Sequence, residues 1–342
     1  MRIAIHHRKG SFSDSWIGYC KEQGIDFKLV NCYDNDLVKQ TENCQILLWH
    51  FHQASERDVL CAKQILYSLQ AAGKIVYPDF RTNWHFDDKV GQKYLLESIG
   101  AEMIKSYVFY DKAVAKKWAH GTSYPKVFKL RKGAGSSRVQ LVLNKREAIQ
   151  LINTAFKSGF RHYEPTTNLK ERWRKYRLNA TGIKDVLKGV LRFGYTTEFD
   201  RMVAREKGYI YFQDFVPDSK FDIRVIVINK KAFAIRRLVR KNDFRASGSG
   251  LNQYDKELIP EKAVELSFQI SEKIGSQSLA IDLVLDDCEP KVIEISYGYL
   301  QDVYKDCTGY WDRNLNWHEG TFDPQYWVID ALIKDAESSA RK

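Results

Sequence analysis

The sequence predicts an α/β protein in which a small parallel α/β domain precedes lobes of mixed helices and strands. Strand and helix signals alternate through residues 1–80, which is typical of a parallel sheet. From Tyr209 onward, several strands follow one another across short turns, which favours antiparallel pairing. The 342 residues, 44% of them hydrophobic, are enough to build two or three packed lobes.

The N-terminal domain is expected to contain four strands and two helices. The strands are expected at 3–6, 26–31, 45–51 and 74–77, and the helices at 13–22 and 57–71. The second helix follows from apolar residues at helical spacing, from Val59 to Leu69. Pro78 ends this domain, so we expect its boundary at residue 80.

The remaining chain is expected to form two lobes, at 81–208 and 209–342. The first has expected helices at 87–98, 113–119 and 145–156, and strands at 106–110, 126–130 and 138–143. It also contains a basic segment, 161–207, with helical spacing at 170–178 and 184–191, which resembles an insertion. The second has strands at 209–212, 222–228 and 232–239, and a helix that Pro260 opens.

Charge narrows the classes of partner without selecting one. The net charge is +11, and segment 161–207 supplies +6 of it, with 12 Lys/Arg against 6 Asp/Glu. Such a patch fits an anionic substrate, a nucleotide, a membrane headgroup or a nucleic acid. A nucleic-acid role predicts salt-sensitive binding through this segment, and we rank it below the other three.

Composition also bears on the cellular compartment. No stretch approaches 18 consecutive apolar residues, and the N-terminus lacks a secretory signal, so no membrane span is expected. Six cysteines lie scattered without a C-x-x-C pair, which disfavours a disulfide framework or a zinc site. We therefore expect a protein of the reducing cytoplasm.

Two carboxylates are predicted to face each other in a hairpin. Residues 279–285 and 291–295 read as two strands, and symmetry about Cys288 places Asp282 opposite Glu294. Both stand in apolar strands, so either one is protonated or a cation bridges them. All-oxygen ligands favour Mg²⁺ or Mn²⁺. The alternative is a slipped register that turns one carboxylate to solvent.

A glycine-rich loop lies between the strands expected at 126–130 and 138–143. It reads Gly133-Ala134-Gly135-Ser136-Ser137. It fails the dinucleotide fingerprint, because Arg138 stands where the third Gly belongs and a strand follows instead of a helix. It also lacks the G-K-[ST] ending of a P-loop. Its backbone N–H groups suit closure over phosphates. Lys129, on the preceding strand, is expected to point into the cleft that the loop covers. An ordinary glycine-rich hairpin is the alternative.

Arginines follow this pattern on the strands after residue 221. Asp222 and Arg224 share one strand face, and Arg245 precedes a second Gly/Ser loop. Together with a lysine and a metal-carboxylate pair, two arginines describe a triphosphate site. Three further arginines lie on the intervening strand, and we expect two of them to form a solvated edge. They are Arg236, Arg237 and Arg240.

Seven short motifs carry a resemblance to a known family. They are Asp88-Lys89, Val127-Phe128-Lys129 with its loop, Gln213-Asp214-Phe215-Val216, Asp222-Ile223-Arg224, Asp243-Phe244-Arg245, Ile281-Asp282-Leu283 and Val292-Ile293-Glu294-Ile295-Ser296. In this order they resemble the ATP-grasp superfamily, in particular its glutathione synthetase and RimK-type branch of carboxylate–amine ligases. The resemblance runs from about residue 80 to 300, and the preceding α/β domain fits a substrate-binding lobe.

The resemblance implies a mechanism and a set of roles. ATP phosphorylates a substrate carboxylate to an acyl phosphate, and an amine then attacks to form an amide. Residues implied to contact the nucleotide are Lys89, Lys129, Gly133, Gly135, Ser136 and Ser137 at the phosphates, Gln213, Asp214, Phe215 and Val216 at adenine, and Asp218 at the ribose. Asp282, Glu294 and Ser296 would hold Mg²⁺, with Mn²⁺ as the alternative, while Arg224 and Arg245 would stabilise the transferring phosphoryl group.

Two departures from the family pattern are visible. Ser296 stands where the family usually has Asn, and a hydroxyl is the weaker metal ligand. The segment 161–207 has no counterpart in compact members, and by its position it would extend the lid.

The substrate hypothesis comes from the C-terminal region. Residues 297–327 contain nine aromatic residues, which suit stacking on sugar rings or, alternatively, packing of the tail. The tail is similar to ATP-grasp proteins of bacterial surface-polysaccharide synthesis. That similarity implies a uronic acid or acidic sugar, free or lipid-linked, as the carboxylate and an amino acid as the amine. The alternatives are a ligase acting on a polypeptide and a nucleotide-binding interaction protein without catalysis.

Polar residues also follow the N-terminal strands. His6, Arg8, Ser11 and Ser13 lie at or after the first strand, and His50 and His52 end the third. Open α/β sheets bind ligands at the carboxyl ends of their strands. A structural role for each of these histidines is the alternative.

Contact of the basic insertion with the inner face of a membrane is a further hypothesis.

Overall fold

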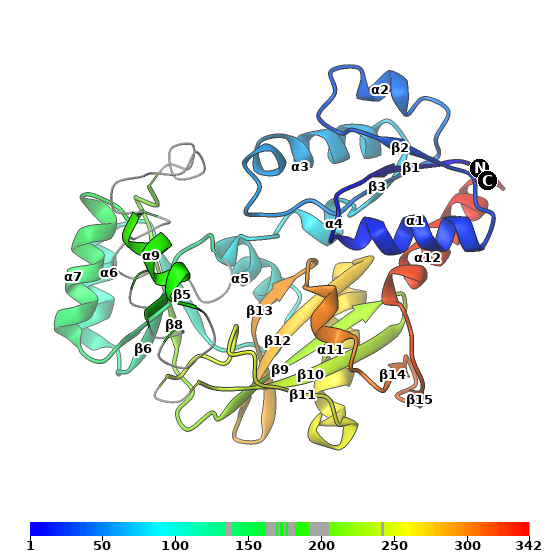
Figure 1. The fold of residues 1–342 in the computed structure, drawn as a ribbon. Coiled ribbons are helices and arrows are strands. Elements are labelled where there is room, and N and C mark those ends of the chain that lie inside the picture. The colour runs from blue at the N-terminus through cyan, green and yellow to red at the C-terminus, as the bar shows by residue number, and fades with distance from the viewer. Residues whose placement is uncertain are drawn as a thin grey trace. The chain divides into compact units, whose positions relative to one another are not determined.

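The structure is a computed structural model. It describes residues 1–133, 139–161, 169, 172, 173, 176, 182–191, 205–240 and 243–341. The chain divides into two compact units, which are described separately. One comprises Met1–Lys105 and Val216–Lys342, and the other Ser106–Phe215. Figure 1 shows the labelled elements of both units.

The N-terminal part of the first unit is a parallel sheet, as the alternation of strands and helices predicts. Its strand order is β2-β1-β3-β4, formed by Phe27–Val30, Ile3–His6, Ile46–Trp49 and Ile75–Tyr77. Its helices are α1 (Phe12–Glu22), α2 (Leu37–Gln40) and α3 (Glu56–Ala71), followed by α4 (Phe80–Asn83) and α5 (Lys89–Ser98). Strands β1 and β3 are buried throughout, as expected for strands covered on both faces.

The C-terminal part of the first unit is built on a seven-stranded sheet. Its main path runs β13-β12-β9-β10-β14-β15, formed by Glu289–Ser296, Ser278–Asp286, Phe221–Ile228, Lys231–Leu238, Gly309–Asp312 and Trp317–Glu319. Strand β11 (Asn252–Gln253) pairs with β10. Helices α11 (Glu261–Ile274) and α12 (Pro324–Ala340) and two 3₁₀ turns, Lys256–Leu258 and Gln301–Tyr304, complete it.

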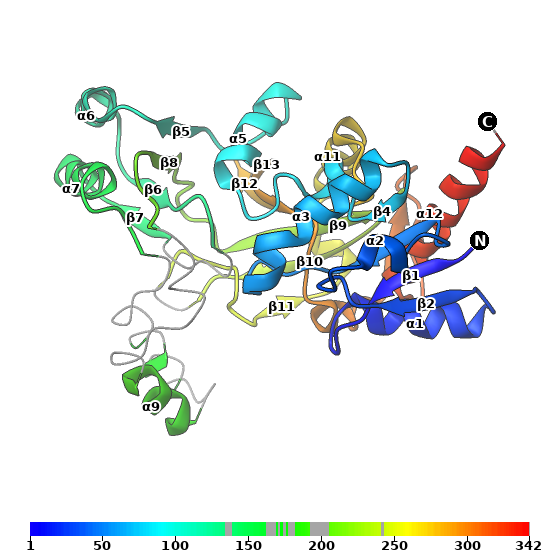
Figure 2. The same cartoon turned by 90° about the horizontal axis from the view of Figure 1, so that it is seen from above.

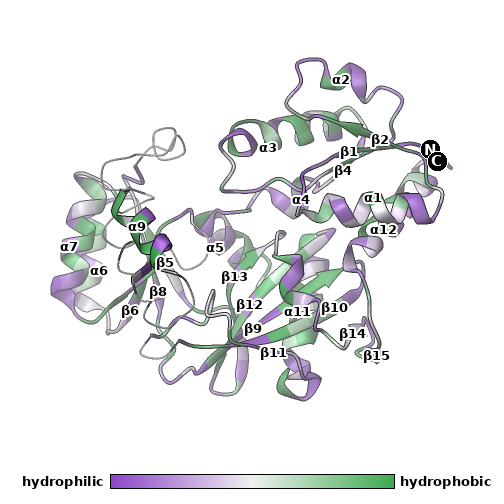
Figure 3. Ribbon diagram, in the orientation of Figure 1, coloured by the Kyte–Doolittle hydropathy of each residue, from purple (hydrophilic) through white to green (hydrophobic). Residues whose placement is uncertain are grey.

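Alternation along the strands gives this sheet two apolar faces. Ile226, Phe233 and Ala280 join one core with residues of the N-terminal sheet. Ile223 and Val225 lie an odd number of positions from Ile226 along β9, and Ile281 lies one position from Ala280 along β12. Their side chains therefore point to the opposite face, where they join the other core with α11. Figure 3 shows hydrophobic residues along these central strands. Helix α12 packs beside α1, where the Trp16 indole N–H donates to Gln325 Oε1 at 3.0 Å.

The second unit contains a four-stranded sheet with the order β5-β8-β6-β7. The strands are Ser106–Phe109, Ile210–Asp214, Lys126–Lys129 and Gln140–Val142. Helices α6 (Lys112–Gly121) and α7 (Lys145–Phe156) cover one face through alanine and isoleucine side chains. The third helix, α9 (Ile183–Leu191), lies apart from α6 and α7 in Figure 2.

The division into units differs from the three domains expected at 1–80, 81–208 and 209–342. Strand β8, expected to begin the C-terminal lobe, hydrogen-bonds to β5 and β6 and so lies within the second unit. Helix α5, expected in the lid lobe, lies in the first unit beside β13. The three-domain division stays a prediction. Strand pairing assigns β8 to the second unit, and the contact with β13 assigns α5 to the first.

Candidate active site

Three adjacent strands of the large sheet carry a row of charged residues. In the antiparallel register, Asp282 of β12 lies opposite Arg224 of β9 on one side and Glu294 of β13 on the other. Directly opposed residues project from the same face of a sheet. The charged row lies on the same face of the sheet as Ile226 and Ala280, which belong to the core shared with the N-terminal sheet.

The predicted pairing of Asp282 with Glu294 is confirmed, but the hairpin reaches it by a different route. The turn is the two-residue segment Asp287-Cys288, both residues at positive φ, and it pairs Asp286 with Glu289. That register alone would shift Asp282 by one residue. A bulge between Asp282 and Leu283 leaves Ile293 without a partner in the register and restores the pairing.

Arginine side chains supply the positive charge at Asp282. Arg224 Nη2 donates to Asp282 Oδ2 at 2.6 Å, and Arg237 Nη2 lies 3.0 Å from Oδ1. Burial alone would raise the pKa of Asp282, but the two guanidinium groups outweigh it and lower that pKa well below its usual range. The two guanidinium groups therefore keep Asp282 ionised, and a cation bridging it to Glu294 stays a prediction.

Arg237 is the residue that the sequence reasoning missed. It donates from Nε and Nη2 to both oxygens of Asp222, at 2.6 and 2.8 Å, and only 6% of its surface is exposed. Arg240 is also buried and donates to the carbonyl of Gly248 at 2.7 Å. Expecting two of Arg236, Arg237 and Arg240 to form a solvated edge was wrong, because Arg237 and Arg240 donate to acceptors inside the fold.

Glu294 and Ser296 have partners of their own. The ammonium of Lys89, the first residue of α5, lies 3.1 Å from Glu294 Oε1, and its side chain is 6% exposed. Helix α5 starts there because Asp88 caps it, accepting the N–H of Gly91. The Ser296 hydroxyl donates to the Gly298 carbonyl at 2.9 Å and so closes a local turn.

Arg245, the second arginine implied to act in catalysis, lies in the segment after β10. Its guanidinium donates to both oxygens of Asp243 at 2.7 to 3.0 Å. The side chains of this pair are 26% and 12% exposed. The Asp243-Phe244-Arg245 motif is thus a short loop closed by its own ion pair.

In the second unit, the residues implied to bind the nucleotide form a buried chain of hydrogen bonds. Lys129 Nζ donates to Gln213 Oε1 at 2.7 Å, and Gln213 Nε2 donates to the Ser106 hydroxyl at 3.0 Å. Lys126 pairs with Asp214 across the same two strands. Lys129 is 7% exposed, and its expected position in a cleft covered by the glycine loop stays a prediction.

The implied adenine-binding segment coincides with the boundary between the units. Phe215 ends the second unit and Val216 resumes the first. Asp218, implied at the ribose, is exposed and has a positive φ of 57°. Gly133 has a φ of 120°, which favours glycine, whereas Gly135, Ser136 and Ser137 lie outside the described residues.

The aromatic residues of the C-terminal segment are packing residues. Tyr297, Tyr299, Tyr304 and Trp327 are buried in the core shared with the N-terminal sheet. Tyr326, which is partly exposed, stacks on Tyr19 with a centroid separation of 4.2 Å. The alternative considered from the sequence, in which these rings pack the tail onto the domain, is what the structure shows.

Among the described residues, no cluster of three His, Cys, Asp or Glu side chains gathers around one point. Among these residue types, Asp282 and Glu294 are thus a pair without a third ligand in the described part of the chain. None of the described helices is long and apolar enough to cross a bilayer.

Comparison with known proteins places this geometry in a recognised fold. The chain has the ATP-grasp fold, and residues 196–305 match the family model of the RimK-like ATP-grasp domain. The resemblance read from the sequence is thereby confirmed. A search of curated protein sequences finds no match.

Solved structures with this fold extend over nearly the whole chain. A RimK-domain ATP-grasp protein from Sphaerobacter thermophilus has a TM-score of 0.56 at 15% identity, covering 97% of this chain and 99% of that one. D-alanine–D-alanine ligase from Bacillus anthracis gives 0.59 at 14%, covering 100% and 99%, and a second structure of it is complexed with ATP. The ATP-grasp ligase PsnB, complexed with minimal precursor, Mg and ADP, gives 0.53 at 13%, covering 98% of each chain.

Proposed function

We propose that this protein is an ATP-dependent carboxylate–amine ligase. The observation that carries the proposal is the row Arg224–Asp282–Glu294, which the register of three strands brings together at the positions that the family resemblance implies. The fold and the family match support the same reaction class.

The reaction would proceed in two balanced steps. A carboxylate oxygen of the substrate attacks the terminal phosphorus of ATP, and ADP leaves. The amine nitrogen then attacks the acyl carbon, inorganic phosphate leaves, and the nitrogen loses a proton. Negative charge develops on the phosphoryl oxygens in the first step, and fixed cations such as Arg224 and Arg245 would stabilise it.

We propose that the nucleotide-binding residues are those that the family resemblance implies. Lys89, Lys129 and the Gly133–Ser137 loop would contact phosphates, and Gln213 to Val216 would contact the adenine, with Asp218 at the ribose. The buried positions of Lys89 and Lys129 support this, because a lysine held inside a fold is oriented before the phosphate arrives.

The residues fit Mg²⁺ together with a polyphosphate. Asp222, Asp282 and Glu294 carry three negative charges, and Arg224, Arg237 and Lys89 carry three positive charges, so the cluster is already neutral. A bare divalent ion would leave the cluster with a net charge of +2, which is costly where water is scarce. A metal–nucleotide complex is net negative, and Asp282, Glu294 and Ser296 offer the oxygen ligands that Mg²⁺ prefers.

For the substrates, the proposal is an acid joined to an amine, with an amino acid as the amine. A uronic acid or acidic sugar stays a hypothesis, but burial of the aromatic tail removes stacking as its support. A polypeptide acceptor is the alternative, and the structural likeness to PsnB, solved with a minimal precursor, favours testing it. A nucleotide-binding protein without catalysis predicts ATP binding and no turnover.

We further propose that the protein works in the cytoplasm and touches the inner membrane face through its basic insertion. Helix α9 supports this contact. Its residues Ile183, Leu187, Val190 and Leu191 are 47 to 73% exposed and share one face, while Val186 and Gly189 are buried on the other.

The experiment is ADP release by the purified protein with ATP and Mg²⁺. Pooled amino acids are supplied with and without pooled uronic acids, acidic glycans and short acidic peptides. ADP that appears only with both an acid and an amine supports the ligase. ATP binding without ADP release in every combination favours the non-catalytic alternative.

Two variants and one control locate the site. Glu294→Gln and Asp282→Asn are each expected to lower the rate by about 100-fold or more, because each loses a carboxylate charge that would hold Mg²⁺. Glu289→Gln, on the same strand but in an exposed pair with Lys262, is expected to leave the rate unchanged. Full activity in either site variant would move the site elsewhere.

A further inference from the structure

Histidines at the carboxyl ends of β1 and β3 are held in one tautomer. The backbone N–H of Cys32 donates to His6 Nδ1 at 3.0 Å, that of Phe12 to His50 Nδ1 at 3.2 Å, and that of Ala54 to His52 Nδ1 at 3.1 Å. A nitrogen that accepts from a backbone N–H carries no proton. In the neutral ring the proton therefore lies on Nε2, which becomes a donor.

His50 is the most informative of these side chains. It is 9% exposed, and the contacts of the described residues give its Nε2 no acceptor. Burial, followed by the nearby charges of Arg8 and His52, lowers the pKa of His50 to about 3. At neutral pH it is thus an uncharged donor, and its Nε2 is not one of the enclosed unpaired atoms of the described residues, so a ligand can reach it.

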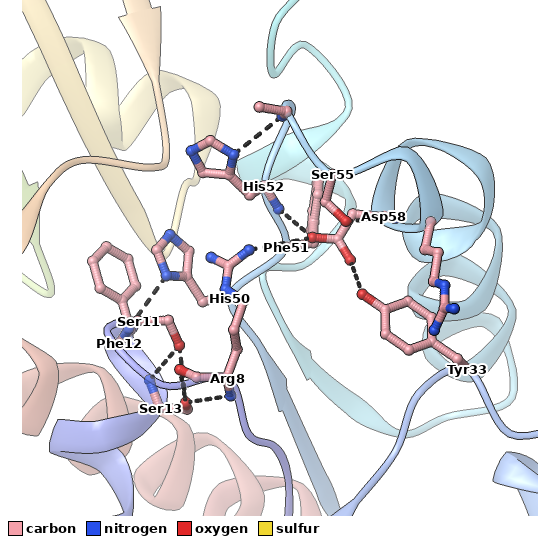
Figure 4. Close-up of polar contacts among 12 residues, drawn as sticks. Arg8, Ser11, Phe12, Ser13, Tyr33, His50, Phe51, His52, Ser55 and Asp58 are labelled. Atoms are coloured by element: carbon pink, nitrogen blue, oxygen red, sulfur yellow. Dashed lines mark hydrogen bonds and ion pairs between the residues drawn. The ribbon is translucent and has the colours of Figure 1, made fainter. Parts of the chain in front are cut away.

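Arg8 brings a positive charge to the same place. Figure 4 shows its guanidinium beside the ring of His50, on the side toward Asp58. Among the described residues its ion-pair partner is Asp58, whose Oδ2 lies 3.7 Å away, beyond hydrogen-bond distance. Asp58 is itself occupied, because it accepts the N–H of His52 and the hydroxyl of Tyr33.

The start of α1 does not account for this arrangement. Its first N–H groups already have acceptors, since Phe12 N donates to His50 and Ser13 N to the Ser11 hydroxyl. The donors left over are side-chain groups, namely the guanidinium of Arg8 and the Nε2–H groups of His50 and His52. All three can donate hydrogen bonds to one acceptor that carries several oxygens.

The cluster lies close to the proposed catalytic strand. An ideal Cβ on Gly298 would be 3.8 Å from His50 Nε2, and the Tyr297 hydroxyl donates to the Phe51 carbonyl at 2.5 Å. Gly298 is four residues after Glu294, so the two places are separated by at most about 14 Å of chain. One small molecule could reach both.

We propose that Arg8, His50 and His52 bind an oxyanion of the acid substrate, a second anionic group besides the carboxylate that reacts. This rests on the proposed ligase function. The reacting carboxylate must stay nucleophilic. Hydrogen bonds from one guanidinium and two N–H donors would stabilise its negative charge and so lower its nucleophilicity. We therefore assign these three side chains to a different anionic group. The substrate class is therefore an acid with a further carboxylate or a phosphate.

The test is a titration of the protein, labelled with ¹⁵N-histidine, with inorganic phosphate in one arm and acetate in the other. Sodium chloride at equal ionic strength is the reference. The ring signals of His50 and His52 are expected to shift and saturate at millimolar anion, while His120 in α6 stays in place. A tighter phosphate arm identifies a phosphorylated acid, and a tighter acetate arm a dicarboxylic acid.

Variants complete the design. Arg8→Gln is expected to weaken the anion about tenfold or more, because its charge-assisted hydrogen bonds are lost. Arg2→Gln, which removes an exposed arginine paired with Asp26, should leave the titration unchanged. Unsaturable shifts, or equal affinity in Arg8→Gln, would overturn the proposal. ATP is absent throughout, so this failure is distinct from failure of the ligase assay.

Discussion

At the scale of single residues, the candidate site is a set of buried charges that neutralise one another. Asp282 binds two guanidinium groups, and Arg237 in turn binds Asp222. The pKa of Arg224 is raised well above its usual value, because Asp282 outweighs the burial that opposes its charge. The buried charges of the network therefore stabilise one another.

Asp282→Ala is expected to destabilise the fold as well as abolish activity. It leaves Arg224 and Arg237 buried with one carboxylate fewer, and breaking a buried ion pair costs about 3–5 kcal/mol. Urea unfolding of the variant and the native protein measures this loss. Asp26→Ala deletes the same group from an exposed pair with Arg2 and should cost less than about 1 kcal/mol. Equal losses would contradict the network.

At the scale of elements, the hairpin β12–β13 shows how a small irregularity positions a site. Its two-residue turn alone would place Ile293 opposite Asp282, and the side chain of Glu294 would then lie on the other face of the sheet. The unpaired Ile293 corrects the register by one residue. The bulge thus serves the pairing of Asp282 with Glu294, and the turn sequence alone does not reveal it.

Helix α9 is expected to bind anionic vesicles. Its exposed apolar face and its lysines Lys184 and Lys188 are the combination that interfacial helices use, with both hydrophobic and hydrophilic residues visible in Figure 3. Leu187→Glu should lower vesicle co-sedimentation about tenfold. Val38→Glu, at an exposed valine of α2, is the matched control and should have no effect. If the native protein does not co-sediment with anionic vesicles, the membrane proposal is wrong.

At the scale of the whole molecule, two buried histidines couple the fold to pH. Burial lowers the pKa of His50 to about 3 and that of His85 to about 4. His85 is fully buried, and neither of its ring nitrogens has a hydrogen-bond partner among the residues that the structure describes. The unfolded chain binds protons at both residues below about pH 6.5, whereas the folded chain does not.

Stability is therefore expected to fall as the pH drops from about 6.5 toward 4, by about 1.4 kcal/mol per pH unit for each of the two histidines. Above pH 6.5 this contribution is constant. His85→Phe should reduce the slope by one histidine's share, as read from urea unfolding between pH 7 and 5. His120→Phe, on an exposed position of α6, should leave the slope as in the native protein. An unchanged slope in His85→Phe would refute the assignment.

The sequence by itself determined the order and type of most elements, and it predicted that Asp282 faces Glu294 but not the bulge that brings them together. Apolar periodicity and turn residues are local signals, so β1, α3, α7 and the hairpin follow from neighbouring residues. The motif order also indicated the ATP-grasp fold, which the comparisons confirm.

Only the tertiary structure decided which distant residues meet. Arg237 neutralises Asp282 and Asp222, β8 joins the smaller sheet, and the aromatic tail fills the core shared with the N-terminal sheet. The tautomers of His50 and His52 depend likewise on backbone N–H groups that the fold places beside them. Spacing along the chain does not encode these contacts, because a buried charge or ring takes its partner from whatever the packing of separate elements brings within reach.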